Sequence, residues 1–269
     1  MKKIFSLAIC VMALLFAGCE QNDPTIGNYK AKAFSVSADK QVVFSPGNLQ
    51  YHPAKNIWRF AERQSDRIGE ANRNCSSTYN GWLDLFGWST SANNYGVTTS
   101  IDNADYSGSF VDWGTNKIGN DAPNTWRTLT ANEWNYMVFN RSNADNLKGI
   151  AHVSGTNGLI LLPDDWECPS GIIFKSGFHS DNSTEAYGQY QTFTTDQWSK
   201  LEAAGAVFLP AAGVRYGSDV YDEQNVSNYW SATNYRSNNA YFFFFYSDAA
   251  FLNHCSRSYS LSVRLVKDL

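Results

Sequence analysis

Hydrophobic and polar residues alternate near the start of the chain. Phe34 and Val36 precede a short polar turn, and Val42 and Phe44 follow it. Alternation on both sides of a short turn predicts a β-hairpin. The segment 58–68 mixes aromatic and charged positions instead, and we expect it to be helical.

A second pattern predicts a helix in the middle of the chain. Thr130 and Glu133 have the spacing of a capping box, in which a hydroxyl and a carboxylate bind the first free amides of a helix. Trp134, Met137 and Val138 follow at the spacing of one apolar helical face. We therefore expect a helix that begins at Thr130.

Further elements are shorter. Thr195 predicts the start of a second helix, which should end at Gly205. Short apolar runs predict strands at 158–162, 171–174 and 206–209.

Two stretches lack helical patterns. The segment 72–124 is rich in Gly, Asn, Ser and Asp, with apolar side chains set among them, and we expect long loops held by buried aromatics. From residue 228 the pattern is strand and loop. The predicted fold class is therefore α+β, with two helices, short antiparallel strands and long irregular loops.

The N-terminus carries an export signal. Lys2 and Lys3 precede an apolar run, 4–16, that is too short to span a bilayer. Small residues then lead into Cys19, in an arrangement that resembles a bacterial lipobox, although an ordinary cleaved signal peptide is an alternative. The resemblance implies that Cys19 is lipidated and becomes the new N-terminus.

The export signal sets the expected domains and location. We expect a signal peptide (1–18), a lipidated tether (19–32) and one domain (33–269). Acyl chains would anchor the protein to the membrane. Glu20 is not the aspartate associated with inner-membrane retention, so we expect the outer membrane, with the protein facing the cell exterior.

Composition argues against a nucleic-acid partner. The 269 residues carry a net charge of −4, and the 21 Lys and Arg are scattered rather than clustered. Hydrophobic residues make up 43% of the chain and charged residues 17%, which suits a folded body. Most of the nine Trp should lie in the core.

No metal site or catalytic motif is recognisable. We expect the four histidines to be surface or loop residues, because none has a ligand partner at metal-binding spacing. Cys75, Cys168 and Cys255 remain after export, and a Cys75–Cys168 disulfide is possible. No motif for phosphate binding or nucleophilic catalysis occurs. We therefore expect a binding protein without cofactor, metal or enzymatic activity.

The C-terminal half resembles a known family. The segments 228–233 (NYWSAT), 240–245 (AYFFFF) and 260–266 (SLSVRLV) are similar, in this order, to the closing elements of bacterial C-type-lectin-fold proteins. The segment 126–134 resembles the helix start of the related formylglycine-generating-enzyme-like branch. This resemblance implies a C-type lectin-like fold. Leu265 stands where the family has proline, which affects the expected course of the last strand.

The family includes the variable proteins of diversity-generating retroelements, in which adenines of AAY codons are randomised. Randomising the first two bases of AAY cannot give Lys, Glu, Gln, Met or Trp. These five types number 38 in residues 1–234, and none occurs in the 32 residues of 235–266, where about five would be expected from composition. The resemblance therefore implies a variable region at about 234–260.

This region should form the binding face. By the family pattern Tyr241, Phe243 and Phe245 face the core, so that Phe242, Phe244 and Tyr246 form an exposed aromatic row. Exposed aromatic, Ser and Asn side chains suit adaptable recognition. The predicted ligand-binding residues are Asn234, Arg236, Ser237, Asn238, Asn239, Phe242, Phe244, Tyr246, Ser247, Asp248, Phe251, Leu252, Asn253, His254, Ser256, Ser258 and Tyr259.

Three functions compete on this evidence. The first is a diversified surface lipoprotein that binds a protein or glycan ligand, and the second is a fixed lectin-like adhesin or glycan-binding lipoprotein. The third is an enzyme of the formylglycine-generating type, whose chemistry needs a cysteine pair in this region. Cys255 is the only cysteine there, so we favour the binding functions.

Overall fold

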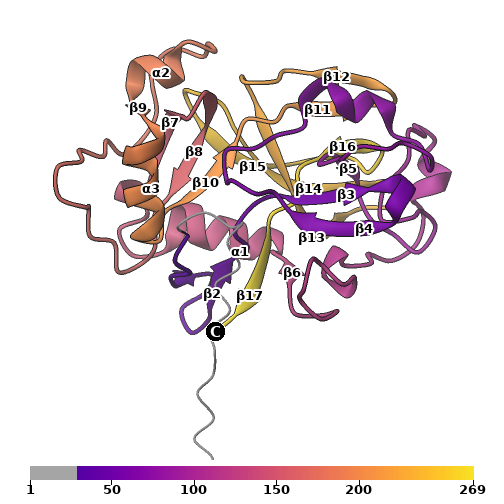
Figure 1. Cartoon of the computed structure of the whole chain (residues 1–269). Coiled ribbons are helices and arrows are strands. Elements are labelled where there is room, and N and C mark those ends of the chain that lie inside the picture. The colour runs from indigo at the N-terminus through magenta and orange to yellow at the C-terminus, as the bar shows by residue number, and fades with distance from the viewer. Residues whose placement is uncertain (1–28) are drawn as a thin grey trace, which may run out of the picture.

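The computed structural model describes residues 29–269 and has a mixed α+β architecture (Figure 1). The predicted signal peptide, Cys19 and residues 19–28 of the predicted tether lie outside the described residues. The last residues of that tether contact the domain: the Tyr29 hydroxyl donates to the Phe44 carbonyl oxygen at 3.2 Å, and Lys32 pairs with Asp165. Within residues 29–269, no helix is long and apolar enough to cross a bilayer.

Helices are few and short. The α-helices are α1 (Ala131–Asn135), α2 (Ala186–Tyr190) and α3 (Thr195–Ala203), and the π-helical segment η5 (Tyr136–Asn140) continues α1. The 3-10 turns are η1 (Pro53–Lys55), η2 (Gly69–Asn74), η3 (Asn103–Tyr106), η4 (Trp113–Thr115) and η6 (Ala144–Asn146).

Strands are more numerous. They are β1 (Phe34–Ser35), β2 (Gln41–Phe44), β3 (Leu49–His52), β4 (Ile57–Phe60), β5 (Phe86–Gly87), β6 (Arg127–Thr128), β7 (Lys148–Val153), β8 (Thr156–Leu161), β9 (Thr192–Phe193), β10 (Val207–Pro210), β11 (Val214–Tyr216), β12 (Asp219–Tyr221), β13 (Ser227–Tyr235), β14 (Asn239–Phe245), β15 (Ala250–Ser256), β16 (Tyr259–Leu261) and β17 (Leu265–Asp268).

These strands form five small sheets. Their orders are β1-β2-β17-β6, β10-β8-β7-β9, β12-β11-β16-β5, β13-β14-β15 and β3-β4. The pairings are antiparallel except that of β7 with β9. In Figure 1, β7–β10 with α2 and α3 lie on one side of the molecule, β3–β5 with β11, β12 and β16 lie on the other, and β13–β15 lie between them.

Several predicted elements are confirmed. The first hairpin forms as β1 and β2, with Phe34 opposite Val42. The capping box at Thr130 and Glu133 begins α1, and the chain from β13 onward contains no helix. The second helix forms as α3, but its capping residue is Thr194 rather than the predicted Thr195, because the capping box joins Thr194 to Gln197.

Other predictions are wrong. The segment 58–68 is not helical: its first residues belong to β4, which pairs with β3 across a hairpin that buries Trp58 against Tyr51. The segment 171–174 is not a strand. A third helix, α2, was not among the two predicted; it is five residues long and has no side-chain cap.

The core has three parts, and two of them meet at the β13–β15 sheet. One cluster packs α1 and the β1–β2 hairpin against β8 and β10, and it includes Phe243 and Phe245 of β14. A second cluster packs the long segment 72–124 against β3, β4 and β16, and it includes Phe242 of the same strand. The third lies between α3 and the β7–β10 sheet. Strand β14 is therefore covered on both faces.

Buried aromatics anchor the long irregular segment, as predicted. Trp88 and Trp113 are buried, and the Trp88 indole donates to the Ser231 carbonyl oxygen in β13 at 2.9 Å. In return the Trp230 indole donates to the Phe86 carbonyl oxygen at 2.7 Å. These bonds hold the segment against the β13–β15 sheet without a long regular element.

The chain closes next to its beginning. Leu265, which stands where proline was expected, begins β17, and this strand pairs with both β2 and β6. The preceding Arg264 is buried and donates to Gln64 at 2.6 Å. Burial lowers the pKa of the Arg264 guanidinium to about 10.

Candidate functional site at the β13–β15 sheet

The predicted binding region folds into three consecutive antiparallel strands. Tyr229 lies opposite Phe243, and Phe243 lies opposite Leu252. An irregularity in the register between Trp230 and Asn234 gives β13 extra residues before the turn to β14. The predicted variable region, about 234–260, thus spans the end of β13, all of β14 and β15, and both of their turns.

One face of the sheet packs on α1. Phe243 and Phe245 have no exposed surface, and the Phe243 ring stacks on Trp134 with centroids 5.0 Å apart. Leu252, which we predicted as a ligand-binding residue, is half-buried on this face and packs against the same core cluster. The side-chain parity that the sequence predicts for β14 is therefore confirmed at Phe243 and Phe245.

Near the β13–β14 turn, the sheet face that carries Phe243 reaches the protein surface. There the Tyr235 ring stacks on His254 with centroids 3.8 Å apart, and Tyr241 meets both rings edge to face. The Arg236 guanidinium lies 5.2 Å from the Tyr235 centroid, and Asn239 Nδ2 lies 3.3 Å from His254 Nδ1. His254 is exposed and both tyrosines are half-buried, so ring surface and polar atoms lie together at the protein surface.

Tyr235 and Tyr241 were absent from the predicted ligand-binding residues. A signal for Tyr235 was available, because it begins the 32-residue window that lacks five residue types. Tyr241 was assigned to the core by parity, yet α1 covers the face at Phe243 and leaves Tyr241 half-buried.

The opposite face differs from the prediction. Phe242, expected in an exposed row, is only 8% exposed and contacts Trp230 with centroids 6.2 Å apart. Phe244 and Tyr246 are half-buried rather than exposed. The cause is the segment 72–124, which packs on this face and turns the expected row into part of the second core cluster. Alternation along one strand cannot reveal a cover that comes from a distant segment.

Two predicted contact residues are buried for other reasons. The Ser247 hydroxyl donates to the carbonyl oxygens of Asp181 and Ser183, at 2.9 and 3.1 Å, and accepts from the Ser183 amide. Ser247 therefore fastens the β14–β15 turn to the loop before α2. Ser258 is buried beside Arg257, whose guanidinium donates to the Tyr106 carbonyl oxygen at 3.1 Å.

The remaining predicted residues are accessible, and they gather at two places. Exposed are Asn234, Arg236, Ser237, Asn238, Asp248, Phe251, Asn253 and His254, and half-buried are Asn239, Ser256 and Tyr259. Most lie at the β13–β14 turn and along β15. Phe251 is 47% exposed and stacks on Phe244 with centroids 5.3 Å apart.

One cysteine lies in this sheet. Cys255 is a free cysteine, and burial raises the pKa of its thiol, which keeps it protonated at neutral pH. Cys75 and Cys168 are also free, so the disulfide considered between them does not form. Within residues 29–269, no group of three or more His, Cys, Asp or Glu side chains could hold a metal ion.

Part of the chain matches a family model. Residues 177–266, about a third of the chain, match the model of a domain of unknown function (DUF8237). The match spans the loop fastened by Ser247 and the whole β13–β15 sheet. No curated protein and no solved structure matches the chain.

Proposed function

We propose that this protein is a surface-displayed lipoprotein of the C-type lectin-like fold that binds a protein or glycan ligand through its β13–β15 sheet. We propose further that residues 234–260 are diversified, as in the variable proteins of diversity-generating retroelements. The protein is anchored to the outer membrane by lipid on Cys19, faces the cell exterior and carries out no catalysis.

One observation carries the proposal. The 32 residues that lack Lys, Glu, Gln, Met and Trp, 235–266, include strands β14 and β15 with their turns and continue through β16 to the start of β17. Within this stretch the exposed side chains are aromatic, Asn, Ser, Asp, Arg and His, which supply contact area and adaptable hydrogen bonds. Beneath these side chains, Phe243 and Phe245 are buried in the core and support the sheet.

The fold assignment rests on the same region. The order of the C-terminal motifs carries the resemblance, and the capped helix α1, whose Trp134 stacks on Phe243, and the long loops held by buried Trp88 and Trp113 are compatible with it. A variable surface on such a support is chemically suited to binding, because aromatic side chains can change there without disturbing the core.

The gene's surroundings test the diversification directly. A reverse transcriptase gene and a near-copy of the sequence encoding residues 234–260 should lie nearby, with differences confined to adenines of the near-copy. If neither is present and the region is invariant among strains, the protein is instead a fixed lectin-like adhesin or glycan-binding lipoprotein.

Binding tests the location of the face in either case. The combined variant Asp248→Ala, Phe251→Ala, Asn253→Ala and His254→Ala should fold normally and lose binding to a glycan array and to immobilised cell-surface proteins. Central aromatic anchors are each worth about 2 kcal/mol or more. A control variant carries the exposed changes Lys55→Ala and Lys117→Ala, which lie outside this surface. Equal binding by all three proteins would exclude the β13–β15 sheet as the binding site.

A further inference from the structure

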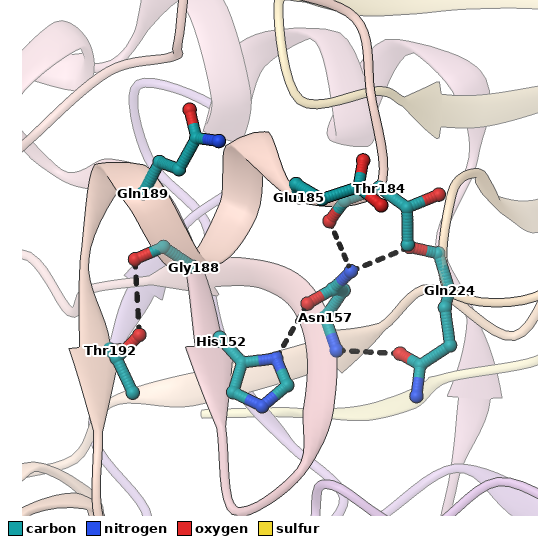
Figure 2. A pocket seen from close by; sticks show the side chains of 8 residues that line it. All are labelled: His152, Asn157, Thr184, Glu185, Gly188, Gln189, Thr192 and Gln224. Atoms are coloured by element: carbon teal, nitrogen blue, oxygen red, sulfur yellow. Dashed lines mark hydrogen bonds between the residues drawn. The ribbon is translucent and has the colours of Figure 1, made fainter.

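A pocket lined mainly by residues with polar side chains lies apart from the predicted binding residues. Its volume is about 560 Å³, within the range of small-molecule sites. Figure 2 shows its lining, which comes from the β7–β8 hairpin, α2, β9 and two loops. The lining residues are His152, Asn157, Thr184, Glu185, Gly188, Gln189, Thr192 and Gln224.

Asn157 organises this pocket. Its side chain is buried, and its Nδ2 donates to the carbonyl oxygens of Thr184 and Gln224, each at 2.8 Å. Two carbonyl acceptors at one amide atom identify that atom as nitrogen, so the Asn157 Oδ1 must be the atom that faces His152. The distance from Asn157 Oδ1 to His152 Nδ1 is 2.6 Å (Figure 2).

This bond fixes the tautomer of the neutral imidazole. Because Oδ1 of Asn157 can only accept, His152 Nδ1 must carry the hydrogen. The lone pair of the neutral ring then lies on Nε2, which has no hydrogen-bond partner within residues 29–269. Asn157 is thus a positioning residue that leaves Nε2 as the acceptor atom of the His152 ring, and His152 lines the pocket.

The other free groups define the ligand class. Glu185 and Gln189 are exposed, and their side chains have no hydrogen-bond partner in the described part of the chain. Thr192 donates to the Gly188 carbonyl oxygen at 3.1 Å, which leaves its hydroxyl oxygen free to accept. The lining therefore offers acceptors together with an amide that both donates and accepts.

The charge and the side-chain types of the lining narrow the class of ligand further. No Lys or Arg lines the pocket, so an anionic ligand would gain no ion pair, and no tyrosine, tryptophan or phenylalanine offers a stacking platform. Several closely spaced hydroxyl groups would match this lining, because each hydroxyl both donates and accepts. Such an array of hydroxyls is the chemistry of a neutral saccharide.

The pocket is joined to the binding face through one short loop. Thr184 accepts from Asn157 at the pocket, and the neighbouring Ser183 is bonded to Ser247 in the β14–β15 turn. A ligand seated beside Thr184 therefore lies one residue along the chain from the contact that holds that turn. Exposed Asp248 follows directly after Ser247.

From these contacts we propose that the pocket around His152 is a second binding site, specific for a neutral saccharide hydrogen-bonded to His152 Nε2 and Gln189. The site is independent of the proposed diversified face, because His152 and Asn157 lie outside residues 234–260. Its saccharide would be held by hydrogen bonds, without metal or aromatic stacking.

The tautomer is the first test. In ¹⁵N-labelled protein under mildly alkaline conditions, long-range ¹H–¹⁵N correlation should show His152 protonated at Nδ1, the minor tautomer of free imidazole side chains. Asn157→Ala should shift His152 toward the Nε2-protonated form. If the wild-type protein already carries the proton on Nε2, the proposed acceptor does not exist and the proposal fails, whether or not the variant folds.

The ligand class is the second test. Glucose, galactose, mannose and N-acetylglucosamine are titrated into labelled protein, with inorganic phosphate and a primary amine as comparison probes. At least one sugar should shift the His152 and Gln189 signals saturably. His152→Ala and Gln189→Ala should each weaken its binding by roughly two- to tenfold, as expected for one hydrogen bond.

A matched histidine variant keeps the two sites distinguishable. His254→Ala, on the β13–β15 face, should leave sugar binding at the pocket unchanged. Binding of the amine or phosphate alone would refute the saccharide assignment, and so would sugar binding that His254→Ala abolishes and His152→Ala does not. Loss of ligand binding at the β13–β15 face would leave these pocket results unaffected.

Discussion

The variant Phe242→Ala tests whether Phe242 is buried, as in the structure, or exposed, as the alternation of side chains along β14 predicts. On alternation alone Phe242 is a surface residue, and its removal should change the free energy of unfolding by within about 0.5 kcal/mol. In the structure its ring is 8% exposed and lies against Trp230 and Phe244. Truncating a buried phenylalanine costs about 3–5 kcal/mol, from lost transfer energy and the cavity left behind.

The magnitude makes the experiment decisive. For a domain of this size, about 1 kcal/mol shifts the melting temperature by roughly 2–4 °C, so Phe242→Ala should lower it by about 6–20 °C. Urea unfolding gives the same comparison as a free energy. Phe251→Ala is the control, since Phe251 is 47% exposed on the same face and should cost about 1 kcal/mol or less.

The test compares the loss of stability in Phe242→Ala with the loss in Phe251→Ala. A loss for Phe242→Ala no larger than that for Phe251→Ala would mean that the segment 72–124 does not cover this face. The second core cluster would then be wrongly placed, and the exposed aromatic row predicted from the sequence would be restored. A large loss in Phe242→Ala alone supports a sheet buried on both faces.

Three further predictions concern other parts of the chain. Cys19→Ala should move the protein from the membrane fraction to the soluble fraction, because the proposed anchor is lipid; retention after a carbonate wash would contradict this. Chelation with EDTA should leave the melting temperature unchanged; a fall of many degrees would reveal a metal site. Burial raises the pKa of Asp84 to about 6. The folded state then binds this proton more tightly than the unfolded chain, so stability should decline from about pH 4 to 6, and Asp84→Asn should lessen that decline in urea unfolding.

Short-range sequence patterns predicted the elements that are stabilised by contacts between neighbouring residues. The capping boxes of α1 and α3 depend on residues three positions apart, and the first hairpin depends on alternation around one turn. The orientation of Phe243 and Phe245 toward the core followed from the period of a strand. In each case the sequence neighbours themselves supply the stabilising contacts.

The errors have long-range causes. Phe242 is buried by a segment that begins about 170 residues earlier, and Ser247 is buried by the loop before α2. Segment 58–68 was misread because β4 is stabilised by pairing with β3 rather than by a helical face. The helix α2 lacks a side-chain cap, so it has no start signal in the sequence.

The pocket could not have been found from the sequence for the same reason. His152 and Asn157 are adjacent across a hairpin, but the carbonyl acceptors that orient Asn157 belong to Thr184 and Gln224. Nothing in the spacing of these four residues predicts that they meet. An isolated histidine in a strand is, on sequence alone, an ordinary surface residue.

Burial on both faces of β14 limits where a diversified surface can lie. Side chains such as Phe243, Phe242 and Ser247 hold the sheet to α1, to the segment 72–124 and to the loop before α2, so changes there would cost folding energy before they altered recognition. Side chains such as Asn253 and His254 project from the edge strand β15, where most substitutions are tolerated. The structure therefore separates positions that maintain the sheet from positions that can vary within the same seven-residue strands. Substitutions can change ligand recognition here without unfolding the sheet only because the positions that tolerate substitution alternate with the positions that hold the sheet and are distinct from them.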